Sequence, residues 1–426
     1  METIYERCCG LDIHKKTVGA CLIVPGPLGR SAKEIRTFGT MTEDLLKLSD
    51  WLTANRVTHV AMESTGVYWK PIWNLLEGNF ELLLANAQHI KAVPGRKTDV
   101  KDCEWIADLL PRGVGGPTYS AHHGLLKGSF VPDLPQRELR ELTRYRTSLV
   151  RERTSEVNRL QKTLEGANIK LSSVATNTMG KSGRQILEEM LRGSSDAKTL
   201  AQLAKGRLRE KIGELERALE GCFGAHQRFL VAQQLAHIDF LDDTIEQVSA
   251  QVQERMRPFD EALSRLDAVP GVGRRTAEVL AAEIGAEIGI QMARFPTPAH
   301  LASWAGMCPG NNESAGKRKT ARTRKGSPWL RSALVEAAHA AARTKETYLS
   351  AQYHRLAARR GKKKAAVAVG HTILVIVYHL LKQGTTYADL GPIYFDQHDR
   401  QAVERRLVNR LHRLGYKVTL ESLSAA

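Results

Sequence analysis

The first 112 residues alternate between strand-like and helix-like patterns, and this alternation constrains the fold more than any other feature. Strands that alternate with helices along a chain favour an α/β sheet. We therefore expect an α/β domain over residues 1–130, with the Gly/Pro-rich stretch 112–124 as a loop near its end. The β-rich runs are 5–13, 17–24, 57–62 and 81–85, and the amphipathic segments lie near 43–54 and 68–78.

The pattern changes after Pro135 to long stretches of helical or heptad spacing. Residues 135–166 predict a long amphipathic helix or coiled coil, and residues 204–256 predict a second helical stretch. The two stretches could form an antiparallel hairpin, join protomers, or belong to an ordinary bundle within one chain. We expect a helical region over 131–257 and a mainly helical domain with basic loops over 258–426.

The charge of the chain is concentrated in that last domain. The chain has 62 Lys and Arg against 46 Asp and Glu, a net charge of +16 and a pI near 9.6. Residues 314–364 alone contain 15 basic and 2 acidic residues. Such a balance favours a polyanionic partner, although it does not separate DNA, RNA and an acidic membrane.

Two observations favour a soluble protein of the cytoplasm. The six cysteines form no CxxC pair, and the N-terminal residues lack the apolar core of a signal peptide. The longest apolar run, 365–381, contains two histidines and is short for a membrane span, so we expect a buried helix there and no membrane partner.

Carboxylates follow two of the expected strands. Asp12 closes one apolar run and Glu63 closes another, while Asp99 and Asp102 lie three residues apart on an expected helix. Oxygen ligands suit Mg²⁺ or Mn²⁺, and a metal pair can act on a phosphodiester. A capping or solvated role explains each carboxylate better when it is taken alone, whereas the four together favour a metal site. Glu104 and Asp108 compete for the fourth position.

Three features of the C-terminal domain suit nucleic acid. Gly271 and Gly273, between two helical runs, are typical of a helix-hairpin-helix that contacts phosphate, or of a plain tight turn. Ser314 lies in a Gly/Asn-rich loop, where it is either a nucleophile or a turn residue. The basic cluster that follows is Lys317, Arg318, Lys319, Arg322, Arg324 and Lys325.

Taken together and in order, these motifs resemble those of the DEDD-type insertion-sequence transposases, also called bridge-RNA-guided recombinases. The segments that carry the resemblance are GLDIHKKTV, AMESTGVYW, GRKTDVKDCEWIADLL, PGVGRRTAEVLAAEIG and AGMCPGNNESAGKRKTARTRKG. The stretch 112–124 and a local extension near 283–292 depart from the pattern of the family.

The resemblance implies a RuvC-like (RNase H-like) N-terminal domain, a coiled-coil middle and a helical transposase domain. It assigns the acidic tetrad to Asp12, Glu63, Asp99 and Asp102, and the nucleophile of a covalent serine–DNA intermediate to Ser314. It also implies a structured guide RNA, donor and target DNA, a dimer or tetramer, and a bacterial, nucleoid-associated location. Two alternatives stay open: a hydrolytic RuvC-like nuclease of the junction-resolvase type, and a non-catalytic nucleic-acid-binding scaffold.

Overall fold

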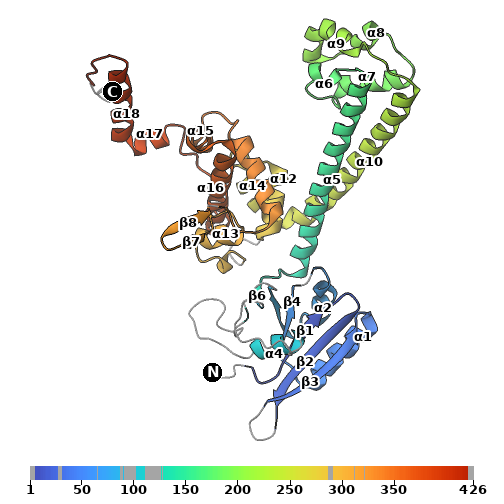
Figure 1. Cartoon of the computed structure of the whole chain (residues 1–426), viewed down its shortest axis with the longest axis vertical. Coiled ribbons are helices and arrows are strands. Elements are labelled where there is room, and N and C mark those ends of the chain that lie inside the picture. The colour runs from blue at the N-terminus through green and yellow to red at the C-terminus, as the bar shows by residue number, and fades with distance from the viewer. Residues whose placement is uncertain are drawn as a thin grey trace. The chain divides into compact units, whose positions relative to one another are not determined.

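The computed structural model of the chain divides into two compact units, Met1–Asp133 and Leu134–Ala426 (Figure 1). The predicted boundary at 130 lies close to this division, whereas the predicted boundary at 257 lies inside the second unit. For residues 291, 293, 312–314 and 318–320 the description covers the main chain alone. The described residues are 5–26, 31–64, 66–86, 90, 102–110, 126, 128–285, 291–310, 312–320 and 322–420.

The first unit is a mixed sheet with the strand order β3-β2-β1-β4-β5-β6. β1, β2 and β3 pair antiparallel, β4 and β5 run parallel to β1, and β6 pairs antiparallel with β5. The predicted α/β class is confirmed, and this arrangement is compatible with a RuvC-like domain. The elements are β1 (Cys8–Ile13), β2 (Thr17–Pro25), β3 (Ser31–Gly39), α1 (Thr42–Ala54), β4 (His59–Glu63), α2 (Trp69–Leu76), β5 (Glu81–Ala85), α4 (Asp102–Leu109) and β6 (Gly128–Ser129).

Helices cover both faces of this sheet. Because side chains alternate across a strand, Cys9, Leu11 and Ile13 of β1 face one core with α1 and α2. Cys8 faces the other core with Ile106 of α4. The four predicted strands and the two predicted helices are therefore present, each displaced by at most three residues at either end.

β3 was missed because its sequence, SAKEIRTFG, has charged residues where a half-buried strand would have apolar ones. It is an edge strand, and its first four residues are exposed. Charged side chains on an edge strand hinder pairing with other chains, so the property that hides the strand from pattern analysis suits its position.

Two long antiparallel helices open the second unit, α5 (Leu134–Gly166) and α10 (Ala225–Met256). Arg255 pairs with Glu138 near one end, and Gln234 Nε2 donates to Thr163 Oγ1 at 3.2 Å near the other. They pack within one chain, which was one of the predicted arrangements. Smaller elements pack around the far end on a core of their own (Figure 1): α6 (Leu171–Val174), α7 (Lys181–Leu191), α8 (Ala197–Ala201), η2 (Gly206–Lys211) and α9 (Ile212–Leu219).

The predicted continuous helical stretch over 204–256 is wrong at residues 220–224, where the chain leaves the helix. The amide of Cys222 donates to the Ala167 carbonyl at 2.8 Å, and a Cβ at Gly221 would lie 2.5 Å from that same oxygen. The close approach of two main chains therefore replaces helical hydrogen bonds here.

A helical core completes the second unit around α16, whose residues Val369, Ile373, Leu374 and Val377 are fully buried. α16 is long and apolar enough to cross a membrane by length and composition, yet this burial confirms the predicted core helix. The elements are η3 (Arg257–Phe259), α11 (Asp260–Asp267), α12 (Arg274–Ile284), η4 (Gln291–Arg294), α13 (Pro298–Trp304), β7 (Asn312–Ser314), β8 (Lys317–Thr320), α14 (Pro328–Ala341), α15 (Tyr348–Arg360), α16 (Lys362–Gln383), α17 (Tyr394–His398) and α18 (Arg400–Arg413).

Candidate active site

Asp12 and Glu63 lie at the carboxyl ends of neighbouring parallel strands. The register of β1 and β4 pairs Leu11 with Met62, so the two carboxylates occupy the next step of the ladder. Strand alternation places both on the sheet face that α4 covers. Asp12 is 22% exposed in its side chain, and its Oδ2 lies 3.2 Å from His14 Nε2. The structure thus brings together the first two predicted site residues.

Helix α4 packs directly on this face because β1 has a glycine there. A Cβ at Gly10 would fall 2.4 Å from the Ala107 nitrogen and 2.5 Å from the Cys103 oxygen. Cys103 also lies near Asp12, because a Cβ at Gly19 would fall 3.7 Å from Cys103 Sγ and 3.9 Å from Asp12 Cβ. Burial raises the pKa of the Cys103 thiol, and the negative charge of Asp12 adds to that increase. Asp102, the first residue of α4, is exposed and precedes Cys103. The start of α4 therefore lies at the Asp12 end of β1.

The competing carboxylate Asp108 lies toward the other end of β1. Its Oδ2 accepts a hydrogen bond from Lys33 Nζ at 2.8 Å. Burial, followed by the charge of Asp108, raises the pKa of Cys8 to about 12, and Cys8 begins the strand that Asp12 nearly ends. Asp108 is thus away from Asp12, because Lys33 lies opposite Ile23, and Ile23 lies opposite Cys8 at the start of β1. Glu104 follows Cys103 directly on α4 and stays a candidate ligand.

The donor set has the chemistry of a site for hard divalent ions. Asp12, Glu63 and Asp102 offer oxygen ligands, and half-buried strand ends limit the competition from water. Among the described residues no three acidic, histidine or cysteine side chains are close enough to form a metal-ligating group. The fourth predicted ligand, Asp99, and the loop 112–124 lie outside the described residues.

Ser314 ends the first strand of a tight β-hairpin in the second unit. β7 and β8 pair antiparallel with Ser314 opposite Lys317, and the two-residue turn has positive φ at Ala315 (50°) and Gly316 (72°). A Pro309–Thr323 bridge closes the base of the hairpin. The side chain of Ser314 lies outside the description. A turn of this type holds the serine main chain at the tip rather than in a loose loop.

The predicted basic cluster forms the returning strand of this hairpin and the segment after it. The side chains of Arg318 and Lys319 are outside the described atoms. Those of the other four basic residues, Lys317, Arg322, Arg324 and Lys325, are exposed.

The two glycines between α11 and α12 have different surroundings. Gly271 has φ 88°, and a Cβ there would fall 2.2 Å from the Ala337 oxygen of α14, so this glycine permits close helix packing. Gly273 is exposed and meets no atom within 4 Å. The tight-turn interpretation therefore accounts for Gly271, and a phosphate contact remains a prediction for Gly273.

One network in the second unit escaped sequence analysis. Glu283, at the end of α12, is 2% exposed in its side chain and accepts hydrogen bonds from Arg144 Nε at 2.6 Å and Nη2 at 2.9 Å. It also accepts one from Ser327 Oγ at 3.0 Å, and Ser327 is the N-cap of α14. Helix α5 is thereby tied to the residue that follows the hairpin segment. No local pattern reveals a contact across 139 residues.

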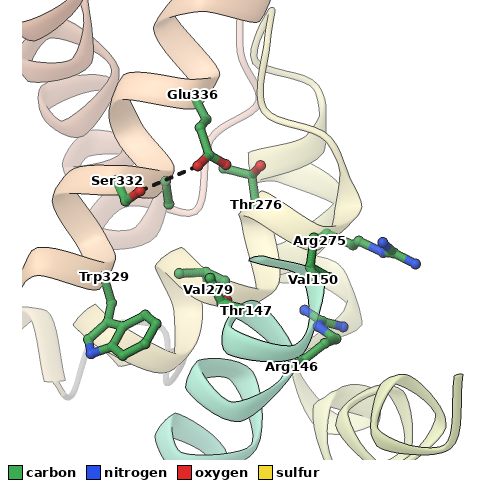
Figure 2. A pocket seen from close by; sticks show the side chains of 10 residues that line it. Arg146, Thr147, Val150, Arg275, Thr276, Val279, Trp329, Ser332 and Glu336 are labelled. Carbon is green, nitrogen blue, oxygen red and sulfur yellow. Dashed lines mark hydrogen bonds between the residues drawn. The ribbon is translucent and has the colours of Figure 1, made fainter. Parts of the chain in front are cut away.

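A buried ion pair lies beside this network, where α5, α12 and α14 meet. Arg146 Nη1 lies 2.7 Å from Glu278 Oε2, and both side chains are 5% exposed. Arg146 also borders a cavity of about 130 Å³ whose other walls include Val279 and Trp329 (Figure 2). The cavity is small, and its contacts serve the packing of α5 against the core.

Comparisons with known proteins bear on both units. Residues 9–169 match a DEDD transposase family model of the IS110 group, and residues 263–354 match a family model described as "Transposase IS116/IS110/IS902 family". A protein of Streptomyces clavuligerus, "Insertion element IS116 uncharacterized 44.8 kDa protein", is 27% identical over 263 residues. That alignment covers 55% of this chain and 61% of the relative.

Proposed function

The chain belongs to the IS116/IS110/IS902 family of transposases, and on that premise we propose that it cuts and exchanges DNA strands for an insertion sequence. The observation that carries the proposal is the placement of Asp12 and Glu63 at the ends of adjacent parallel strands. Both lie on the sheet face that α4 covers, and Asp102 is the first residue of α4. Half-buried strand ends seldom carry neighbouring carboxylates without a chemical use.

The acidic group is the proposed metal site. Asp12, Glu63 and Asp102, together with Asp99, would hold one or two divalent ions, Mg²⁺ or Mn²⁺. A divalent ion bound there supplies charge that stabilises a phosphodiester as its bonds change. The part of these residues is to fix the ligand oxygens on the rigid end of the sheet and to limit the access of water.

Ser314 is the proposed nucleophile. Its Oγ gives up a proton and forms a bond to the scissile phosphorus, while the bond from phosphorus to one deoxyribose oxygen breaks. That oxygen takes up a proton and leaves as a hydroxyl. A hydroxyl of a second strand then attacks the serine phosphodiester, forms the new DNA bond and restores the serine. Each step exchanges one phosphodiester bond for another, so no external energy source is needed.

Cations of the hairpin segment would hold the DNA backbone. Lys317, Arg318, Lys319, Arg322, Arg324 and Lys325 are the proposed phosphate contacts, joined by Gly273 at the start of α12. Each phosphate contact releases counterions, so binding weakens steeply as salt rises. A structured guide RNA that pairs with donor and target DNA would select the DNA sequences, as in other guide-directed enzymes.

The finer fold assignments belong to the same proposal. The first unit would be a RuvC-like domain, α5 and α10 a coiled coil, and α11 with α12 a helix-hairpin-helix. A homo-oligomer, a dimer or a tetramer, is part of the same proposal. The proposed location is the cytoplasm of a bacterium, at the nucleoid.

A trapping experiment tests the serine. Purified protein is incubated with donor DNA that carries the ends of the element, quenched with detergent, and examined for a protein–DNA adduct by gel and mass spectrometry. We expect an adduct on the peptide of Ser314, its absence in Ser314→Ala, and its normal yield in the control Ser195→Ala. An equal yield in Ser314→Ala would overturn the serine assignment.

The same assay separates the alternatives. DNA that is cut without any adduct would identify a hydrolytic nuclease. If Asp12→Ala leaves every DNA product unchanged while binding persists, the chain is a scaffold. Sequencing the RNA that co-purifies with the protein tests the guide, because a specific structured RNA is expected and random cellular RNA would refute it.

A further inference from the structure

A groove of about 980 Å³ opens in the second unit at the base of the serine hairpin. Pro309 and Thr323, which form the bridge that closes the hairpin, are part of its wall. Met307 and Arg322, from the same two chain segments, also line it, and the rest of the wall comes from α14, α15 and α16. The volume is at the upper end of the range of about 300 to 1,000 Å³ that ligand pockets span. It is large enough for at least one nucleotide.

The rim of the groove is cationic. Arg322 and Arg331 line it together with Lys363 and Lys364 from the first turn of α16, and no acidic residue contributes to the lining. Arg331, Lys363 and Lys364 have no ion-pair partner among the described residues. Four cations around one opening, three of them without an ion-pair partner among the described residues, suit phosphate oxygens.

The floor of the groove has a different character from the rim. Met307, Val367 and Ala368 provide an apolar surface. Gln352 stands beside them: its Nε2 donates to Thr372 Oγ1 at 3.0 Å, and its Oε1 is shielded from water with no hydrogen-bond partner in the described part of the chain. Half-buried His371 completes the wall, and burial lowers the pKa of its imidazole, which favours the neutral ring.

We propose that this groove binds one unpaired nucleotide of a DNA strand next to the serine hairpin, with the base on the apolar floor and the flanking phosphates on the cationic rim. The inference rests on the proposed DNA substrate but adds a base-binding subsite to it. A base out of the stack needs an apolar slot and a few polar groups for its edge, and phosphates need cations. The floor supplies the apolar slot and the polar groups, and the rim supplies the cations.

A paired base would leave the floor unused. In a duplex the bases are stacked and their faces are covered, so only phosphates could reach the rim. The proposed ligand is therefore single-stranded at this position, as strands are when they are exchanged.

Photocrosslinking tests the subsite directly and needs no catalysis. The probe is a 12-nucleotide thymidine strand with one central 4-thiothymidine, bound to the full-length protein and irradiated, and the adduct is mapped by mass spectrometry. We expect crosslinked peptides that contain Met307 or residues 362–372, and their loss when the strand is annealed to its complement. Adducts confined to other peptides, such as those of α18, would overturn the inference.

Two variants separate the floor from the rim. Ala368→Trp fills the half-exposed floor and should lower the groove crosslink about tenfold, the scale of one lost base contact. The double variant Lys363→Gln, Lys364→Gln should make the log–log salt dependence of binding shallower by about 1.4, at about 0.7 per phosphate contact of a single strand. The exposed Lys345→Gln, outside the groove, is the matched control and should change neither value.

The two proposals can fail separately. If Ala368→Trp folds, as its thermal unfolding would report, and leaves the groove crosslink unchanged, the subsite is refuted while the serine adduct can still form. If the adduct never forms but the groove crosslink persists, the proposed function fails and the subsite remains.

Discussion

Replacing Glu283 by glutamine tests whether α5 is locked to the base of the hairpin segment. The change keeps the size of the side chain and removes its charge, which two Arg144 nitrogens and Ser327 Oγ now contact. Breaking a fully buried ion pair costs about 3–5 kcal/mol. Since the Arg144 side chain is 37% exposed, solvent screens part of this interaction. We therefore expect Glu283→Gln to lower the free energy of unfolding by about 2–3 kcal/mol.

The assay is urea unfolding of a double-mutant cycle made from Glu283→Gln, Arg144→Met and both together. A coupling free energy of about 1.5–2.5 kcal/mol is expected for side chains joined by two charge-assisted hydrogen bonds. The matched control is Arg153→Met on the same helix, whose pair with Asp242 is between 30% and 46% exposed. Arg153→Met should lower the free energy of unfolding by less than about 1 kcal/mol. Additive effects of Glu283→Gln and Arg144→Met would refute the lock.

Three further outcomes follow from local structure. Gly271→Ala should destabilise the second unit by at least about 2 kcal/mol, because its Cβ meets the α14 main chain and its φ is positive, whereas Gly273→Ala should fold normally, as urea unfolding will compare. The unfolded chain takes up a proton at His371 more readily than the folded chain, so stability should fall as pH drops below about 6.5, and His371→Gln should reduce that fall in thermal melts at pH 5 and 7. Maleimide labelling of the native protein at pH 7, read by mass spectrometry, should modify exposed Cys222 and spare Cys103, whose thiol pKa burial raises.

The elements that could be predicted are those for which one short segment contains the whole signal. The strands that carry Asp12 and Glu63 at or near their carboxyl ends are apolar runs, so the strands and these carboxylates can be predicted without knowledge of their neighbours. The choice between Asp102 and Asp108 could not be made in this way. Both belong to α4, and only long-range contacts show which end of the helix lies beside Asp12: Cys103 and Asp12 meet at Gly19, while Asp108 binds Lys33.

Contacts between distant segments left no trace in the local pattern. Glu283 ends an amphipathic helix and Arg144 lies in a stretch rich in alternating charges, so each reads as an ordinary surface residue. The groove has the same origin, since Arg322 precedes α14 while Lys363 begins α16. These cations come together only when the helices pack around α16. The count of charges in the sequence could therefore predict a positive surface but not the groove that the cations line.

The Glu283 network gives the long helix α5 a mechanical role in the second unit. The side chain of Arg140 donates to the Ala282 and Glu283 carbonyls, and Arg144 binds the Glu283 carboxylate, so two successive turns of α5 are fixed to the end of α12. The same carboxylate bonds to Ser327, the N-cap of α14, where the hairpin segment returns to the core. A displacement of α5 therefore cannot occur without breaking a buried charge-assisted contact or moving the base of the hairpin. Breaking that buried contact costs several RT, so we expect the hairpin to move together with α5. Glu283→Gln should therefore lower the yield of the Ser314 adduct even under conditions where the variant stays folded.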